Sequence, residues 1–148
     1  MGRRSHARAL NVWMNGQLVG EWRLPTRGPM EFLYDAAWNQ SREARPLSLS
    51  LPLTPDPLPL RGEVVRNYFD NLLPDSDRIR ARLQSRFRTR SGDAFDLLEA
   101  IGRDCVGAVQ LLPSNREPED LFTIDAEPLD ERGIEQTLLA AVSGTSTL

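Results

Sequence analysis

The residue types that usually perform catalysis are scarce in this sequence of 148 residues. All 18 basic side chains are arginines, so the chain contains no lysine. Its single histidine is His6, in a polar N-terminal stretch, and its single cysteine is Cys105. A nucleotide-phosphate loop and a Schiff-base enzyme each need a lysine, and a nucleophilic triad needs a histidine beside the nucleophile. We therefore expect no catalytic and no cofactor-binding residue in this chain.

Carboxylates are the plentiful acid–base groups, and three of them, Asp70, Asp75 and Asp77, lie close together around Pro74. Such a cluster could form a metal site or supply a general base. Acidic residues are also favoured where a helix begins, because they cap its N–H groups and complement its dipole. No further ligand follows at a fitting spacing, so we expect no metal site here. Cys105 is expected to be a small core residue and not a reactive thiol.

Basic and acidic residues are divided unequally along the chain. Residues 1–103 hold 16 arginines and 12 acidic residues, whereas residues 104–148 hold two arginines and nine acidic residues. Six arginines and no acidic residue lie between Arg78 and Arg90. These arginines could bind an acidic partner such as a nucleic acid. Alternatively, they could form a solvated helix face whose charge is balanced by the acidic C-terminal part. Both interpretations stay open at this point.

Composition and hydropathy describe one globular domain, with 40% hydrophobic and 26% charged residues. No segment has the apolar length of a signal peptide or a membrane span, and a single cysteine cannot form a disulfide within the chain. We therefore expect a cytoplasmic protein with no membrane partner.

The spacing of apolar residues predicts a β-rich half followed by a helical half. Asn15-Gly16 between two apolar runs predicts a hairpin, because both central residues of a type I′ turn have positive φ. Further strands are expected over 30–34, 47–53 and 106–112. The proline-rich stretch 54–61 is expected to be an extended loop.

Four helices are expected, over residues 64–73, from about 75 to 87, over 94–101, and from about 130 to 142. The second should bury the row Ile79, Leu83 and Phe87, and Gly102 should end the third in a left-handed cap. The predicted fold is therefore α+β: a small antiparallel sheet of about five strands, which could be barrel-like, packed with about four helices.

Three segments resemble the N-terminal subdomain of HipA, the serine/threonine kinase toxin of bacterial HipA-HipB toxin-antitoxin modules. They are ARPLSLSLPL at 44–53, NYFDNLLPDS at 67–76 and FDLLEAIGRDCVGAV at 95–109. The resemblance assigns residues 1–113 to a HipA-like N-terminal subdomain. Residues 114–148 then form an acidic linker and helix leading towards a kinase core that this chain does not contain.

The resemblance also implies a function. In this family, the kinase core binds ATP and Mg²⁺, phosphorylates glutamyl-tRNA synthetase and causes growth arrest and persistence, and all of its catalytic motifs follow this subdomain. The subdomain itself packs on the kinase core and contacts a HipB-like, DNA-binding antitoxin or a second toxin. No catalytic residue of the family can be placed on a residue of this chain. The patternless end at Leu148 favours a part of a longer kinase.

Two alternatives stay open. The chain could be a stand-alone antitoxin, like the short HipS protein of tripartite HipBST modules, and it could bind nucleic acid through the Arg78–Arg90 face. In the toxin-antitoxin interpretations, DNA is reached only through the antitoxin complex, and self-association is possible. The residues expected to face a partner are Asp70, Asn71, Arg78, Arg82, Arg86 and Arg103.

Overall fold

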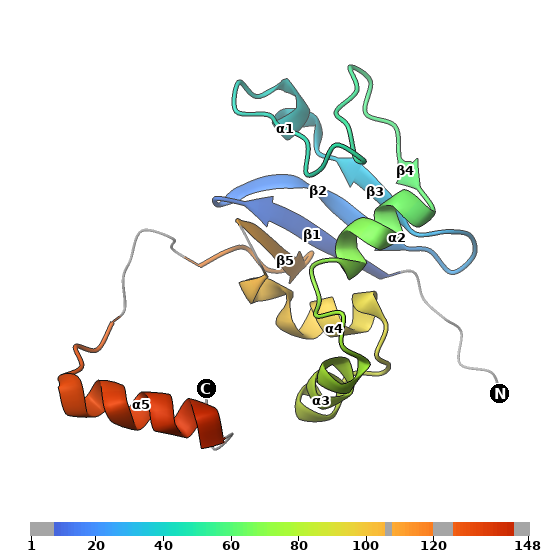
Figure 1. The fold of residues 1–148 in the computed structure, drawn as a ribbon. Helices are drawn as coiled ribbons and strands as arrows, with labels where there is room; N and C mark the ends of the chain where they lie inside the picture. Colours follow the sequence, from blue (N-terminus) through green and yellow to red (C-terminus); the bar gives the residue numbers. More distant parts are fainter. Residues whose placement is uncertain (1–7, 106–107, 120–125, 144–148) are drawn as a thin grey trace.

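An open antiparallel sheet lies at the centre of the computed structural model, which describes residues 8–105, 108–119 and 126–143 (Figure 1). Within these residues the strand order is β4-β3-β2-β1-β5. The strands are β1 Arg8–Met14, β2 Gln17–Leu24, β3 Glu31–Tyr34, β4 Leu60–Arg61 and β5 Val109–Pro113. The α+β prediction is confirmed, but barrel-like closure is wrong. β4 and β5 lie at opposite edges, and a two-residue strand offers too little pairing to close a barrel.

The β1–β2 hairpin forms where the sequence predicts it. Asn15 has φ 49° and Gly16 has φ 77°, the pair of positive values that a type I′ turn requires. The two strands pair from Arg8 opposite Leu24 to Met14 opposite Gln17. β1 also pairs with β5, so the hairpin forms the middle of the sheet.

The predicted strand over 47–53 is wrong. Leu51 folds back to Ser48 in an isolated bridge, and Leu49 is 96% exposed. Tyr34 holds this turn, because its hydroxyl donates to the Leu51 carbonyl and accepts from the Leu47 N–H at 2.9 Å. Prolines on either side of the segment remove ladder donors. The edge strand is instead β4, which ends the proline-rich stretch and pairs with β3.

The described residues form five α-helices, one more than predicted. They are α1 Ala36–Gln40, α2 Glu63–Asp70, α3 Asp77–Phe87, α4 Ala94–Ile101 and α5 Glu131–Ser143. The unpredicted α1 begins where the Asp35 side chain accepts hydrogen bonds from the N–H groups of Ala37 and Trp38. A capped helix of this length is too short to show an apolar repeat in the sequence.

The prediction of a left-handed cap at Gly102 is wrong. Gly102 has φ −66° and begins a short 3-10 helix, Gly102–Asp104. Glycine is required there by packing, because a Cβ would lie 2.8 Å from the Leu111 Cβ. β5 begins at Val109, later than predicted, and residues 106–107 lie outside the described residues.

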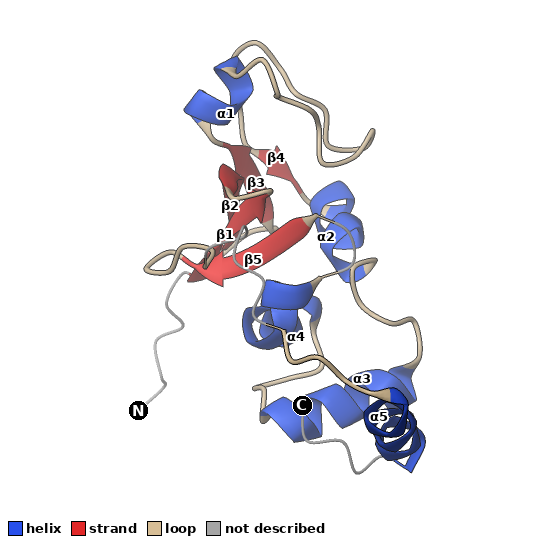
Figure 2. Ribbon diagram, turned by 90° about the vertical axis from the view of Figure 1, so that its left-hand side faces the viewer, coloured by secondary structure: helices blue, strands red, loops and turns tan. Residues whose placement is uncertain are grey.

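The core lies between the sheet and the helices α2 and α4. Trp22 of β2 stacks on Phe69 of α2, with ring centroids 4.0 Å apart, and contacts Phe95 of α4 at 4.7 Å. All three rings are almost fully buried. Figure 2 shows that α4 lies between the sheet and α3, so α3 belongs to an outer layer.

This layering corrects the prediction of a buried row on α3. No α3 residue is fully buried; Ile79 is 42% and Phe87 44% exposed, and Leu83 alone of the three packs against the edge of the core. The periodic row is present, but α4 already fills the space next to the sheet. α5 likewise buries none of its residues.

Candidate partner-binding surface

The turn between α2 and α3 carries two of the predicted residues, Asp70 and Asn71. Asp70 ends α2, and its carboxylate accepts from Arg80 of α3, with Nη1–Oδ1 2.7 Å and Nη2–Oδ2 3.2 Å. Arg80 also donates from Nε to the Pro74 carbonyl at 2.7 Å. Asp70 therefore has an intramolecular partner, while Asn71 follows it as an exposed residue. The hydrogen bond from Arg80 holds the pKa of Asp70 below its usual range.

The outer surface of α3 combines basic and apolar side chains. Arg78 and Arg82 are exposed one position before the apolar residues Ile79 and Leu83. Arg86 is exposed as well, and its guanidinium lies 5.6 Å from the centroid of the Phe87 ring. Because Arg80 is turned towards Asp70, its guanidinium does not belong to the exposed row of arginines on α3. We call Arg78, Ile79, Arg82, Leu83, Arg86 and Phe87 the α3 face.

Arg103 lies apart from α3, in the 3-10 turn that follows α4. It is exposed and forms an ion pair with Glu119, from the acidic stretch after β5. The predicted partner-facing residues thus come from three elements: the end of α2, the α3 face and the turn after α4. Together they present guanidinium groups, an amide and apolar surface, which can bind an acidic or amphipathic protein segment.

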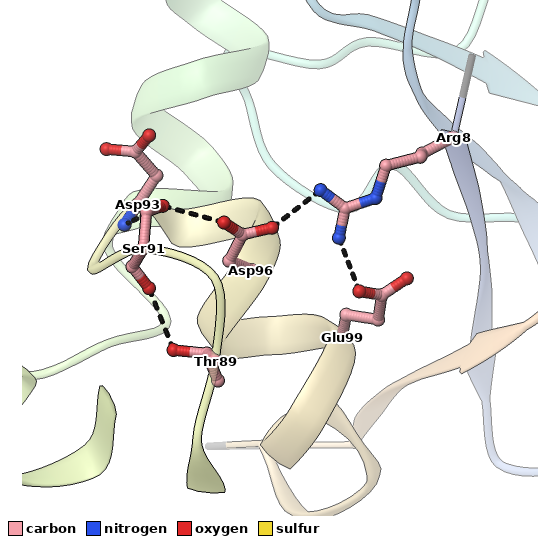
Figure 3. A network of polar contacts seen from close by, with 6 residues as sticks. All are labelled: Arg8, Thr89, Ser91, Asp93, Asp96 and Glu99. Atoms are coloured by element: carbon pink, nitrogen blue, oxygen red, sulfur yellow. Dashed lines mark hydrogen bonds and ion pairs between the residues drawn. The ribbon is translucent and has the colours of Figure 1, made fainter. Parts of the chain in front are cut away.

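A polar network at the start of β1 ties the sheet to α4 (Figure 3). Arg8 donates to Asp96 at 2.6 Å and also to Glu99, and its guanidinium lies 4.6 Å from the centroid of the Phe95 ring. Ser91 donates to the other Asp96 oxygen at 2.7 Å. This network could not be predicted from the sequence, since Arg8 lies 88 residues from Asp96 and no local pattern links them.

Asp96 keeps its negative charge in this network. Burial would raise the pKa of its carboxyl group, but the hydrogen bond from Ser91 and the ion pair with Arg8 outweigh burial and lower it. The carboxylate therefore holds the loop before α4 and the beginning of β1 together. Ser91 also accepts from the Asp93 N–H at 3.1 Å, which shapes the loop that enters α4.

A cleft of about 500 Å³ opens between α2, the β2–β3 loop and the beginning of α4. Arg66, Asp70 and Arg80 supply its charged wall, together with Glu63 and Asp93. The side chains that line the cleft include both acidic residues and arginines, and Asp70 and Arg80 already form an ion pair with each other. The cleft is thus a polar recess beside the α3 face.

Cys105 is half-buried behind the 3-10 turn, as expected for a packing residue. Burial, with a smaller effect of the Asp104 charge, raises the pKa of its thiol to about 11. Its Sγ donates to the Gly102 carbonyl at 3.3 Å. Among the described residues, no group of three or more His, Cys, Asp or Glu side chains is placed to hold a metal ion. None of the helices described is both long enough and apolar enough to cross a membrane.

These features define the class of the chain as a small α+β domain whose exposed surface carries basic and apolar residues on an outer helix. Comparison with known proteins gives the family. Residues 10–112 match the model of the HipA N-terminal domain. Because this match covers more than two thirds of the sequence, the chain belongs to the family of HipA N-terminal domains.

Two relatives are longer than this chain. A Sinorhizobium fredii protein, named "Putative kinase Y4mE", is 36% identical over 134 residues, which cover 88% of this chain and 31% of that protein. A chain in the complex of the Shewanella oneidensis MR-1 toxin-antitoxin proteins HipA and HipB with their operator DNA has the same fold. Its TM-score is 0.60 at 23% identity, covering 88% of this chain and 29% of that one. The chain thus spans less than a third of each relative.

Proposed function

We propose that this chain is the non-catalytic binding domain of a HipA-like toxin-antitoxin kinase. In this role it packs on the kinase core and contacts a HipB-like antitoxin. Phosphorylation of glutamyl-tRNA synthetase, growth arrest and persistence then belong to the kinase core. The observation that carries the proposal is the family match over residues 10–112, which includes nearly the whole sheet and the helices α1 to α4.

The chemistry of the chain supports this division of labour. Phosphoryl transfer needs charged groups that bind the nucleotide phosphates and ligands for Mg²⁺. The chain has no lysine, and the Asp70 carboxylate already forms an ion pair with Arg80. ATP and Mg²⁺ are therefore assigned to the kinase core, and the residues of this chain act by binding proteins.

The α3 face and its neighbours are the proposed contact surface for these partners. Exposed guanidinium groups at Arg78, Arg82 and Arg86 can pair with carboxylates, and Ile79 and Phe87 add apolar area. Asn71 and Arg103 extend the same proposal to the end of α2 and the turn after α4. Asp70 contributes by holding Arg80 and the turn in place.

Titration of the purified chain tests the proposal. The partners are a HipA-like kinase core lacking its own N-terminal domain and a HipB-like antitoxin, both from the same organism. Isothermal titration calorimetry should show a Kd of about 10 μM or tighter for at least one of them. The paired change Arg78→Glu and Arg82→Glu should weaken that binding about tenfold or more, whereas Arg42→Glu, at an exposed position far from α3 in the sequence, should not.

Autophosphorylation of the kinase core in the same mixtures distinguishes the two toxin-antitoxin roles. A domain that belongs to the kinase should leave the rate unchanged or raise it, whereas a stand-alone antitoxin should suppress it as the complex forms. Absence of binding to both partners at concentrations of about 100 μM would contradict the proposal in either form.

A further inference from the structure

One face of the sheet is left open. Figure 2 shows α2 and α4 on the same side of the strands, and among the described residues no helix lies over the opposite side of β1 and β5. Side chains alternate between the two faces of a strand, so the half-buried Trp13 and Leu33, whose neighbours in the chain belong to the core, lie on the open face. Leu18 lies there too, because it pairs with Trp13. We call Trp13, Leu18 and Leu33 the outer patch.

The outer patch is apolar, and the charges around it are already paired. Leu18 and Leu33 line a hollow of about 290 Å³, together with Pro57 from the proline-rich loop. The charged side chains of the same face form two ion pairs, Glu21 with Arg23 and Glu31 with Arg61. A segment that covers this face is therefore held by apolar contact and does not have to supply a charge.

Helix α5 carries an open apolar row in the same chain. Ile134, Leu138, Leu139 and Val142 are 49%, 62%, 63% and 89% exposed, and α5 buries none of its residues. The four residues follow one side of the helix, because they are spaced by three to five positions. A helix of 13 residues is only marginally stable in water unless such a row packs against another surface. α5 and the outer patch thus each lack an apolar partner.

The connection from β5 to α5 passes close to the outer patch. Glu119, within this connection, forms an ion pair with Arg103. Arg103 and Gln110 line the same hollow, and Gln110 pairs with Trp13 across β1 and β5. The connection therefore leaves Arg103 at the end of the sheet where Trp13 lies. The eleven residues 120–130 can reach about 36 Å when extended, which is more than the width of the sheet.

We infer that α5 folds back and packs across the outer patch of its own chain. With 13 residues, α5 is about 20 Å long, and the distance from β5 across to β3 is about 14 Å, so one helix spans the patch. In the structure α5 stands clear of the sheet, which is the open arrangement (Figure 1). The α3 face stays free in both arrangements. A partner that binds the outer patch has to displace α5.

Hydrogen exchange of the full 148-residue chain tests whether α5 is packed. The amides of α5 should exchange at least about tenfold more slowly than those of a synthetic peptide with the α5 sequence. Leu138→Glu should remove this protection, because it places a charge in the middle of the apolar row. Gln136→Glu adds the same charge on the opposite side of the helix and should keep it. The protection should be equal at about 20 and 200 μM, since packing within one chain does not depend on concentration.

A spin label shows where α5 packs. In a Cys105→Ser background, a nitroxide on Gln136→Cys should weaken the amide resonances of the outer patch more than those of α3. Adding Leu138→Glu should restore the resonances of the outer patch. The Trp13 indole resonance should also shift on Leu138→Glu, whereas that of Trp22, which is fully buried in the core, should not.

Three results would each overturn the inference. They are exchange of α5 as fast as in the peptide, protection that rises with protein concentration, and loss of resonances centred on α3. The inference does not rest on the proposed function, because none of these measurements includes a kinase core or an antitoxin. It can therefore fail while the proposed function stands.

Discussion

Arg80 and Asp70 form a two-point contact that joins the beginning of α3 to the end of α2. The Arg80 guanidinium donates to both Asp70 carboxylate oxygens, at 2.7 Å and 3.2 Å, and to the Pro74 carbonyl at 2.7 Å. One side chain thus holds both ends of the turn through Pro74. The direction in which α3 presents its exposed face therefore depends on Arg80.

Arg80→Ala should destabilise the domain by about 1–3 kcal/mol, because it leaves a carboxylate and a carbonyl without their donor. Only 16% of the Arg80 side chain is exposed, so water replaces these hydrogen bonds poorly. Arg82→Ala, on the exposed side of the same helix, should change stability by no more than about 0.5 kcal/mol. Urea denaturation followed by circular dichroism measures both values. Equal effects of the two changes would refute a structural role for Arg80.

Asp96→Asn should make the domain less sensitive to acid. The lowered pKa of Asp96 in the folded state means that its contribution to stability is present above the pKa of the unfolded chain, about 4, and is lost as the pH falls below it. The variant should therefore be clearly less stable than the original at pH 7, and this difference in stability should be smaller at pH 3. Urea midpoints at the two pH values provide the comparison. A constant difference across this range would show that the Asp96 charge is not what stabilises the network with Arg8.

Gly20→Ala should prevent or severely weaken folding, by about 3 kcal/mol or more. A Cβ at Gly20 would lie 2.3 Å from the Leu33 carbonyl oxygen and 2.7 Å from a Phe32 ring carbon, inside the β2–β3 pairing. Gly28→Ala is the control, because a Cβ there meets no atom within 4 Å and only the strain of its positive φ, about 1–2 kcal/mol, remains. Thermal melting of the two variants should differ by many degrees. Similar melting temperatures would mean that β2 and β3 are further apart than described.

Cys105 should react slowly with an aromatic disulfide reagent in the native protein. A thiol with a pKa of about 11 has, at pH 8, a thiolate fraction roughly a hundredfold smaller than that of an ordinary cysteine. The same protein in concentrated urea should react at the rate of a small thiol, which serves as the control. A rapid reaction of the native protein would show that the Cys105 thiol is not buried and that its pKa is not raised.

DNA should bind weakly to this chain alone, because Arg80 is engaged with Asp70 and the exposed arginines of α3 are few. Fluorescence anisotropy with duplex DNA should show an affinity that falls steeply between about 50 and 200 mM salt and is independent of sequence. Addition of a HipB-like antitoxin should produce operator-specific binding. Tight, sequence-dependent binding by the chain alone would favour the nucleic-acid alternative over the toxin-antitoxin role.

Local patterns in the sequence predicted several elements correctly. The Asn15-Gly16 turn requires positive φ angles that few other residue pairs tolerate, so the hairpin could be predicted from two residues. α2, α3, α4 and α5 repeat apolar residues at helical spacing and were also expected. The absence of lysine and the excess of arginine over 78–90 are properties of composition alone.

The candidate site needed the tertiary structure. Ile79 and Phe87 have the spacing of a buried row, yet they stay exposed because α4 fills the layer between α3 and the sheet. Asp70 was expected to face a partner, and the structure gives it an internal one in Arg80. No periodicity could reveal either fact, since each depends on how the helices pack against one another and against the sheet.

By itself, the sequence determined the hairpin, the helical half and the limits on chemistry, because turn conformation, helical periodicity and composition act between neighbouring residues. Only the tertiary structure decided that β4 and not 47–53 forms the sheet edge, and that Arg8 meets Asp96 across 88 residues. These contacts depend on distances in space between segments far apart in the chain. Burial, and with it the surface left for a partner, follows from how the layers pack.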